Sequence, residues 1–330
     1  MKILIIGLGS IGRRHLKTVK SIDPTIEAAV LREHSKDKDV GDVAGLVAEV
    51  FLKRDDALAW RPDAVIIANP APYHIETAGI FASGGSHIFL EKPLSDSLEG
   101  IDDLLALCRE QKCVLMVGYC LRFLEPLKVL KKEIDAGRIG KVLHIHATVG
   151  RYLPDWRPGQ DYRQTVSARK DSGGGVILEL SHEIDYVRWL MGEVAKIDSL
   201  VAKISEFDID VEDIAEINLR FESGAIGHIH MDMLDRAANR SCRIVGTEGT
   251  MKWEYDGNHS VKLYDAQAEK WISLWEKEGF DYNRMFIDQF NNFFECIKNG
   301  QEPLINGEEG RRVLELVMEA KNSSQQGVVV

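Results

Sequence analysis

Three titratable side chains follow a glycine-rich turn between residues 171 and 189. Three consecutive glycines, 173–175, precede Glu179, His182 and Asp185, which are spaced at intervals of three. Since a helix advances by about 100° per residue, the three side chains fan round one side of a predicted helix. The opposite side is apolar and carries Val176, Leu180, Ile184 and Val187. We interpret the set as functional; a solvated helical face, or a metal site that lacks its second histidine, are the alternatives.

A lysine follows a predicted strand in the first half of the chain. Residues 87–90 lead directly into Glu91-Lys92-Pro93. A strand end of this kind lies at the carboxyl edge of a parallel sheet, where ligands of open α/β sheets bind. A lysine there can donate a hydrogen bond to a reacting hydroxyl group. The alternative is a Lys-Pro pair in an ordinary loop.

The first strand of the chain ends in a glycine pattern. The apolar residues 3–6 run into Gly7-x-Gly9-x-x-Gly12. Gly7 allows a tight turn, Gly9 lets the backbone approach a pyrophosphate, and Gly12 lets the next helix pack close to the strand. That helix begins near Ile11 and offers N–H groups and a positive dipole end to phosphates. The pattern predicts a dinucleotide site; a glycine-rich turn without a ligand is the alternative.

The end of the second predicted strand indicates which dinucleotide binds. Arg32 stands where NAD-binding sequences of this kind carry an acidic residue, about 20 residues after the last glycine of the pattern. A guanidinium suits a 2′-phosphate, so we predict NADP in preference to NAD. Glu33 is adjacent, and a slip of one residue would restore the acidic residue of an NAD site.

Composition narrows the class of protein. A length of 330 residues favours two domains, and a net charge of −11 argues against nucleic acid or an anionic membrane as a general partner. An apolar run of membrane-spanning length is absent from the sequence, and the apolar stretch near residue 1 is too short for a signal peptide. The five cysteines form no Cys-x-x-Cys pair. We therefore expect a cytoplasmic protein with a small-molecule partner.

Two patterns of elements divide the chain. Over residues 1–120, strands are predicted at 2–6, 26–31, 64–68, 87–90 and 114–117, with helices that include 11–20, 74–83 and 97–111. This α/β rhythm predicts a Rossmann domain. Over residues 121–330, helices are predicted at 126–136 and 308–326, and strands at 142–149, 197–204, 214–221, 225–233, 241–245, 249–255 and 261–264. We expect a second, α+β domain with a large open, mainly antiparallel sheet, through which copies could form a homodimer or homotetramer.

The motifs together resemble the glucose–fructose oxidoreductase, inositol dehydrogenase and MocA (Gfo/Idh/MocA) family. The similarity runs nearly end to end and includes GLGSIGRRH at 7–15, Asn69-Pro70 with His74, EKPLS at 91–95, Gly118-Tyr119-x-x-Arg122-Phe123, GRIGKV at 137–142, the triple glycine with His182 and Asp185, GTEGT at 246–250 and GEEGRRVLEL at 307–316. The combination of Glu-Lys-Pro with Gly-Gly-Gly…His-x-x-Asp is a specific signature of that family. In many relatives the acidic residue stands four positions before the histidine, whereas Glu179 stands three before.

The resemblance implies reversible hydride transfer between NAD(P) and a carbinol of a sugar, polyol or related compound. It implies catalytic roles for Lys92 and His182, the latter as the acid–base group. Cofactor contacts are expected from Gly7, Gly9, Ser10, Ile11, Gly12, Arg32, Asn69, Pro70, His74, Glu91 and Lys92. Substrate contacts are expected from Glu179, Asp185, Tyr119 and Arg122. Two rival activities remain within the resemblance: glycosidic cleavage that uses bound NAD transiently, and cofactor-dependent regulation without turnover.

The segment before the triple glycine suggests the substrate. Residues 151–170 carry five basic and two acidic side chains, a net charge of +3, with three aromatic rings between them. Aromatic faces stack on sugars, and guanidinium groups bind carboxylate or phosphate. We predict an anionic sugar derivative bound by Trp156, Arg157, Tyr162 and Arg163. A basic loop that pairs with acidic surface is the alternative.

Two pairs of histidines alternate along predicted strands, His144 with His146 and His228 with His230. Each pair shares one face of its strand, as zinc ligands do. Because no cysteine or carboxylate accompanies either pair at ligand spacing, we interpret them as solvated sheet positions and predict no metal.

Overall fold

The computed structural model describes residues 1–33, 35, 37–255, 257–277 and 279–326. It divides into two compact units, Met1–Cys120 with Asn283–Leu314, and Leu121–Tyr282 with the chain from Glu315 onward. The sequence-based division placed the whole of 121–330 in one domain. In the structure, the helix α8 (Asn283–Asn299) instead packs on α1 (Ser10–Ile22) of the first unit.

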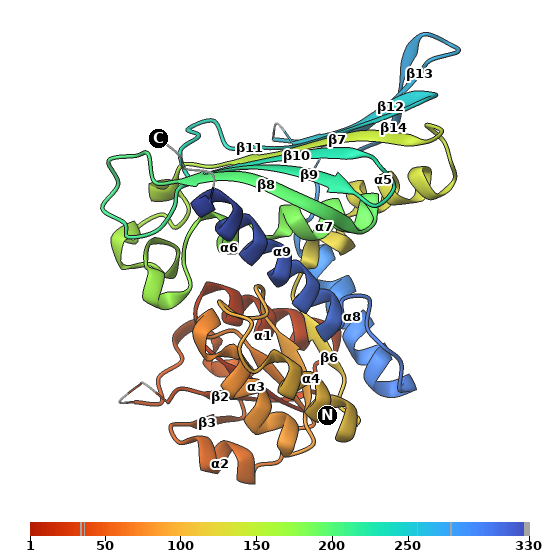
Figure 1. Ribbon diagram of the computed structural model, residues 1–330. Helices are drawn as coiled ribbons and strands as arrows, with labels where there is room; N and C mark the ends of the chain where they lie inside the picture. Colours follow the sequence, from red (N-terminus) through yellow and green to blue (C-terminus); the bar gives the residue numbers. More distant parts are fainter. Residues whose placement is uncertain (34, 36, 256, 278, 327–330) are drawn as a thin grey trace. The chain divides into compact units, whose positions relative to one another are not determined.

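The first unit contains a parallel sheet (Figure 1). Among the described residues its strands lie in the order β3 (Glu49–Phe51), β2 (Glu27–Leu31), β1 (Lys2–Ile6), β4 (Ala64–Ile67), β5 (His87–Leu90) and β6 (Leu115–Val117). Order and direction are those of a doubly wound dinucleotide-binding sheet, which confirms the predicted Rossmann domain. The predicted strands are all present, and β3, with a single glutamate before two apolar residues, was missed.

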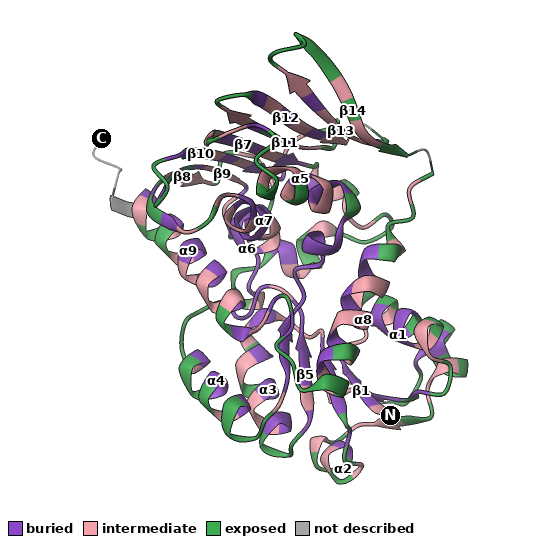
Figure 2. Cartoon of the chain, turned by 90° about the vertical axis from the view of Figure 1, so that its right-hand side faces the viewer, coloured by how far each residue is buried: buried purple, intermediate pink, exposed green. Residues whose placement is uncertain are grey.

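Helices surround this sheet. They are α1, α2 (Arg54–Ala59), α3 (His74–Ser83), α4 (Ile101–Glu110), α8 and the first part of α9 (Gly307–Gln326). Except for the edge strand β3, these strands are almost wholly buried, as the purple ribbon of β1 and β5 in Figure 2 shows. Their near-continuous apolar runs follow from burial of both faces.

The turn between β1 and α1 leaves no room for side chains. Gly7 has φ +89°, and a Cβ there would lie 2.5 Å from the backbone of Ala68. A Cβ on Gly12 would lie 1.9 Å from the carbonyl oxygen of Gly7. At Gly9, by contrast, a Cβ would meet no atom within 4 Å. The helix therefore begins hard against the ends of β1 and β4, beside open space at Gly9.

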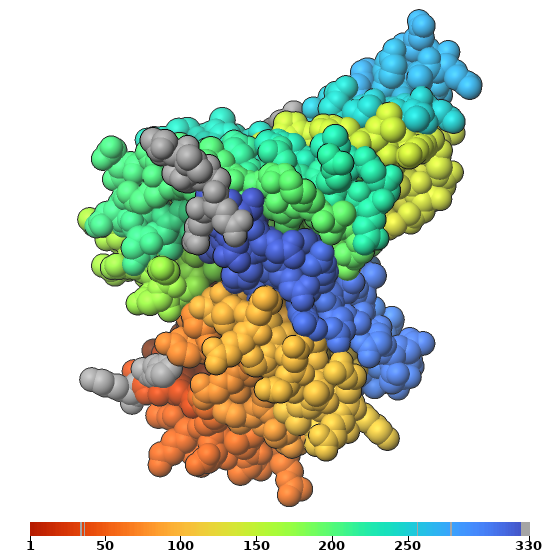
Figure 3. All heavy atoms as spheres, in the orientation of Figure 1, coloured from red at the N-terminus to blue at the C-terminus, as the bar shows by residue number. Residues whose placement is uncertain are grey.

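The second unit contains the predicted mainly antiparallel sheet. Among the described residues its strands lie in the order β14 (Lys270–Lys277), β13 (His259–Asp265), β12 (Gly249–Tyr255), β11 (Asn239–Gly246), β7 (Val142–Gly150), β10 (Ile226–Asp232), β9 (Ile214–Phe221) and β8 (Val194–Ala202). Only β7 and β10 pair in parallel. The edge strand β14 was not predicted. The hairpin of β13 and β14 projects from the rest of this unit as the light blue arm in Figure 3.

Helices cover one face of this sheet. They are α5 (Glu125–Asp135), α6 (Val176–Glu179) and α7 (His182–Met191), and Figure 1 shows all three on the same side. The free edge of β8 is covered too, because its amides at Ser199 and Val201 donate hydrogen bonds to the hydroxyl groups of Ser323 and Ser324 in α9, at 3.3 and 2.8 Å. Covering an edge in this way blocks pairing with another strand.

The turn between β1 and α1 generates a test of packing. Gly12→Ala forces a methyl group into the carbonyl of Gly7, and overpacking of this kind costs about 1–3 kcal/mol or more in unfolding free energy. Gly9→Ala is the matched control, because its methyl group enters open space. Urea unfolding of both variants checks the difference. Equal losses of stability in the two variants would contradict this description of the turn.

Candidate functional site

The lysine predicted to act in catalysis follows β5 directly. Lys92 is partly exposed, while Glu91 and Pro93 on either side are buried. The peptide bond between Lys92 and Pro93 is cis. One oxygen of the Glu91 carboxylate accepts the backbone N–H of Lys92 at 3.2 Å, and the other lies 2.5 Å from Nε2 of His15. His15 lies in the sequence motif at 7–15, and the sequence predicted no role for it.

A buried histidine joins the loops after β4 and β5. His74 is 1% exposed, with Nε2 2.8 Å from the carbonyl oxygen of Asn69 and Nδ1 2.9 Å from that of Pro93. Burial lowers the pKa of His74, and the two carbonyl groups act in the opposite direction. The side chain of Asn69 donates to Thr77 on α3 at 3.2 Å. His74 thus holds Asn69, Pro70 and Pro93 in one arrangement at the carboxyl edge of the sheet.

Arg32 and Glu33, the two residues considered as selecting the cofactor, both form hydrogen bonds within the protein. Arg32 donates to the carboxylate of Asp37 at 3.2 Å and to the carbonyl group of Asp39. Glu33 accepts two hydrogen bonds from Arg54, at 2.8 and 3.1 Å. The side chains of Arg32 and Glu33 are still 27% and 26% exposed. Each therefore keeps a surface to which a ribose or phosphate can bind.

In the second unit, the single helix predicted after the triple glycine is two helices, α6 and α7. The chain leaves helical geometry at Leu180, with φ −103° and ψ 21°, between α6 and α7. Glu179 is the last residue of α6 and His182 the first of α7, and both are partly exposed. The expectation that an uninterrupted helix carries them was wrong. At the break, the hydroxyl group of Ser181 donates to the carbonyl group of Leu178 at 3.0 Å.

The triple glycine before α6 is packed tightly against the loop at 166–169. A Cβ on Gly174 would lie 2.3 Å from the carbonyl oxygen of Val166, and Gly175 has φ +105°. The amide of Gly174 donates to Arg169 and that of Gly175 to Ser167, at 2.9 and 3.2 Å. The glycines thus fasten the basic segment to the start of α6.

Asp185 and Arg122 form a buried ion pair. Nε of Arg122 lies 3.0 and 3.1 Å from the two carboxylate oxygens, and Nη2 lies 2.7 Å from one of them. The two side chains are 0% and 3% exposed. A second buried carboxylate on α7, Glu183, accepts two bonds from Arg240 of β11 at 2.7 and 3.1 Å. These pairs fix α7 within its unit. Tyr119, also predicted to bind substrate, is fully buried in the first unit.

The basic segment contains one arginine that differs from the others. Arg163 is held by Asp161 through bonds of 2.7 to 3.0 Å. Trp156 donates its ring N–H to the carbonyl group of Arg151 at 2.8 Å, and Tyr162 packs on Phe207. Arg151 and Arg169 donate to backbone carbonyl groups. In the described chain, the side chain of Arg157 forms no hydrogen bond or ion pair, and it lines a small hollow with Trp156 and Tyr162.

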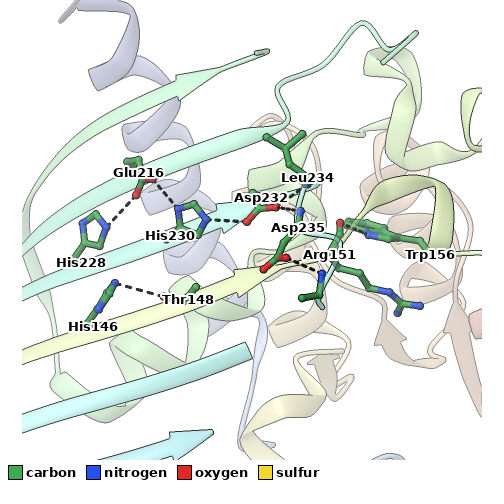
Figure 4. A network of polar contacts seen from close by, with 11 residues as sticks. His146, Thr148, Arg151, Trp156, Glu216, His228, His230, Asp232, Leu234 and Asp235 are labelled. Atoms are coloured by element: carbon green, nitrogen blue, oxygen red, sulfur yellow. Dashed lines mark hydrogen bonds and ion pairs between the residues drawn. The ribbon is translucent and has the colours of Figure 1, made fainter. Parts of the chain in front are cut away.

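The paired histidines lie on the face of the sheet shown in Figure 4. Glu216 lies between His228 and His230, at 3.0 and 2.7 Å, and Asp232 binds the other nitrogen of His230 at 2.8 Å. The hydrogen bond to Asp232, with that to Glu216, raises the pKa of His230 to about 9. Burial lowers the pKa of His144 and His146. Within the described residues, no group of three or more His, Cys, Asp or Glu side chains is arranged to hold a metal ion.

The described helices also include none with the length and hydrophobicity that crossing a lipid bilayer requires.

The His230 network predicts a pH dependence of stability. A folded-state pKa of about 9 lies above the ordinary value of histidine, about 6.5. The ion pairs therefore contribute fully below pH 6.5, and their contribution is lost as the pH rises through 9, on the order of 2–3 kcal/mol in all. Urea unfolding at pH 6 and 9.5 measures this loss, which His230→Asn should abolish. His144→Gln is the control and should keep it. An unchanged pH slope in His230→Asn would disprove the assignment.

Two family models match the chain in succession. Residues 1–119 match the model described as "Oxidoreductase family, NAD-binding Rossmann fold", and residues 127–252 match the "GFO/IDH/MocA C-terminal domain". The two matches do not overlap, and together they contain most of the residues discussed above.

Individual proteins are similar over nearly the full length. The myo-inositol 2-dehydrogenase of Thermotoga maritima is 28% identical, with 99% of this chain and 97% of that protein covered. The 2,7-anhydro-N-acetylneuraminate hydratase of Mediterraneibacter gnavus is 29% identical, with 86% and 75% covered. The WlbA dehydrogenase of Bordetella pertussis, solved with NADH and UDP-GlcNAcA, has the same fold, with a TM-score of 0.83, 24% identity, and 99% and 97% of the two chains covered. Because the models of one family match residues 1–119 and 127–252, the chain belongs to the Gfo/Idh/MocA oxidoreductases and binds NAD through its Rossmann fold.

Proposed function

We propose that this oxidoreductase transfers a hydride between a nicotinamide dinucleotide and a carbinol or ketone of an anionic sugar derivative. The observation that carries the proposal is the position of Lys92. It follows β5 at the carboxyl edge of the sheet, on the edge where β1 runs into the glycine turn. A cationic side chain that is partly exposed at this edge can act on a substrate oxygen.

The glycine turn fits a dinucleotide. A Cβ at Gly9 would enter open space, so the backbone there is accessible to a pyrophosphate, and α1 begins with Gly9 at its N-cap and no side-chain cap. We propose that the cofactor is held by Gly7, Gly9, Ser10, Ile11 and Gly12 at its pyrophosphate, and by Asn69, Pro70, His74, Glu91 and Lys92 towards the nicotinamide. When bound, the nicotinamide supplies the hydride acceptor or donor.

The protein groups then handle the proton. We propose that His182 takes the proton of the substrate hydroxyl group when the carbinol is oxidised, because histidine ordinarily titrates near neutral pH and can both take and return a proton. Lys92 donates a hydrogen bond to the same oxygen and stabilises the negative charge that develops on it. Glu179 and Asp185 are proposed to support substrate binding, Asp185 through its buried pair with Arg122.

This assignment predicts large losses on truncation. Lys92→Ala and His182→Ala should each lower kcat by roughly 10²–10⁴-fold, the usual scale for an acid–base group. Steady-state kinetics on a substrate found by screening measures the effect. The dissociation constant of the cofactor, from protein fluorescence, is the control and should change by a few-fold at most. Near-normal kcat in either variant would remove that residue from the mechanism.

We further propose a preference for NADP. Glu33, which would bind a ribose 2′-hydroxyl group, already receives two hydrogen bonds from Arg54. Arg32 is the residue at this position with charge to offer a 2′-phosphate. Its pairing with Asp37 is exposed, since the Asp37 side chain is 70% accessible, and exposed pairs are weak enough to be exchanged.

Cofactor titrations test this preference. NADPH should bind more tightly than NADH, and Arg32→Ala should narrow the difference by about 1.5–3 kcal/mol, the scale of a charged hydrogen bond. Asp37→Asn removes the competing carboxylate and should widen the difference in affinity between NADPH and NADH. Tighter binding of NADH to the unmodified protein would reject the preference and point to Glu33.

The proposed anionic substrate rests on the basic segment. The segment is hydrogen-bonded to the glycine turn that precedes α6. Arg157, whose side chain forms no hydrogen bond or ion pair in the described chain, lines a hollow with Trp156 and Tyr162. We propose that Arg157 binds a carboxylate or phosphate of the substrate while Trp156 and Tyr162 contact its ring. Arg163 contributes less, because Asp161 already occupies its guanidinium.

Two substitutions separate these arginines. Arg157→Ala should raise KM by roughly ten- to a hundred-fold, because a desolvated guanidinium–anion contact contributes about 1.5–3 kcal/mol. Arg163→Ala should raise KM much less. A smaller change in kcat is expected if the contact is equal in the ground and transition states. Equal kcat/KM for neutral inositol and for sugar acids would contradict the anionic assignment.

A second reaction class is supported by one comparison. The Mediterraneibacter relative is named a hydratase of an anhydro sugar acid. In such a reaction any oxidation of the sugar is reversed before release, so no net NADH accumulates. Absorbance at the NADH band during turnover, together with the spectrum of the purified protein for retained cofactor, distinguishes this class from a dehydrogenase.

Assembly and location complete the proposal. We propose a homodimer or homotetramer formed through the sheet of the second unit, because Figure 1 shows helices on one side of that sheet only. None of the described cysteines forms a disulfide bond, in keeping with the proposed reducing cytoplasm.

A further inference from the structure

A buried histidine on α1 contacts the residue before Lys92. His15 is 0% exposed, and its Nε2 lies 2.5 Å from Oε1 of Glu91, whose side chain is 11% exposed. Both residues belong to the first unit. His15 stands one helical turn after Ile11, so the helix that begins at the glycine turn carries this contact directly.

The imidazole of His15 is enclosed by aromatic rings. Phe89 of β5 and Phe286 and Phe290 of α8 present their edges or faces to it, with ring centroids 5.3, 6.0 and 5.1 Å away. Its second nitrogen, Nδ1, is buried and has no hydrogen-bond partner in the described chain. An apolar side chain would fill this space without burying an unpaired nitrogen. Packing alone therefore does not account for a histidine here.

The carboxylate of Glu91 connects His15 to the backbone of Lys92. Its Oε2 accepts the backbone N–H of Lys92 at 3.2 Å while its Oε1 faces His15. Gly118 closes the remaining side, since a Cβ there would lie 3.1 Å from Oε1. The carboxylate is thus held between a helix, a strand end and the amide of the proposed catalytic lysine. The other titratable or charged groups near it are Lys92 itself and His74 of α3, and Arg14 stacks on the outer ring, Phe286.

We propose that His15 is a positioning residue for Lys92. Its Nε2–H donates to Glu91, holds that buried carboxylate in place, and so sets the backbone from which the lysine side chain extends. The proposal depends on the catalytic role proposed for Lys92. Without the donor, the carboxylate loses the contact of its Oε1 with His15, and the turn at residues 91–93 is held less firmly.

The test compares substitutions that remove the donor with one that keeps it. His15→Leu should lower kcat ten- to a hundred-fold and leave the dissociation constant of the cofactor within about threefold. His15→Gln retains an N–H near the position of Nε2 and should restore most of kcat. Phe286→Leu alters the same aromatic enclosure, keeps the contact between His15 and Glu91, and should leave kcat close to normal.

Two further variants keep the test decisive. In His15→Leu with Glu91→Gln, kcat should fall no further than in the more impaired single variant, because both substitutions break the same contact. If His15→Leu does not fold, Glu91→Gln alone tests the same contact and should lower kcat. A normal kcat in His15→Leu, or in Glu91→Gln when the former does not fold, would overturn the proposal if Lys92→Ala is inactive. An active Lys92→Ala would instead refute the proposed function itself.

Discussion

The contact between Gly12 and the carbonyl group of Gly7 fixes where α1 begins and how it is directed. Any side chain at either glycine would collide with backbone, so the helix starts directly at the ends of β1 and β4. This start places the first-turn amides of α1 beside the open space at Gly9, which is the geometry that a pyrophosphate requires. It also places His15, one turn later, against Glu91. The cofactor turn and the turn that carries Lys92 are therefore set by one backbone contact.

The second unit fixes its histidine by a different means. Two carboxylates on α7 are fully buried, and each is held by an arginine from another element, Asp185 by Arg122 and Glu183 by Arg240. A buried charge is costly unless its partner lies close to it. The position of α7 must therefore satisfy both ion pairs at once. His182 is the first residue of α7, so the position of the helix also sets the position of His182. The two ion pairs thus position α7, as the contact between Gly7 and Gly12 positions α1.

The sequence was informative where local patterns determine structure. Apolar runs predicted β1, β2, β4, β5 and β6, because strands of a parallel sheet are buried on both faces. The strand β3 was missed because a run of three residues gives little signal, and the packing of α8 with the first unit was missed because it depends on a tertiary contact with α1. In the candidate site, Glu179 and His182 were predicted from their spacing, but the break at Leu180 between them was not. The partners of Asp185 and Glu91 on other elements, Arg122 and His15, could not be predicted, since each pairing depends on the final positions of the backbone elements.

The central claim is that a hydride moves directly between the sugar carbon and the nicotinamide. It is tested most directly with a substrate that carries deuterium on the carbon bearing the reactive hydroxyl group. Mass spectrometry of the reduced cofactor after turnover should show one deuterium per molecule, with none acquired when the unlabelled substrate reacts in heavy water. A reduced cofactor without the label, or a product formed with no reduced cofactor released, would contradict the claim.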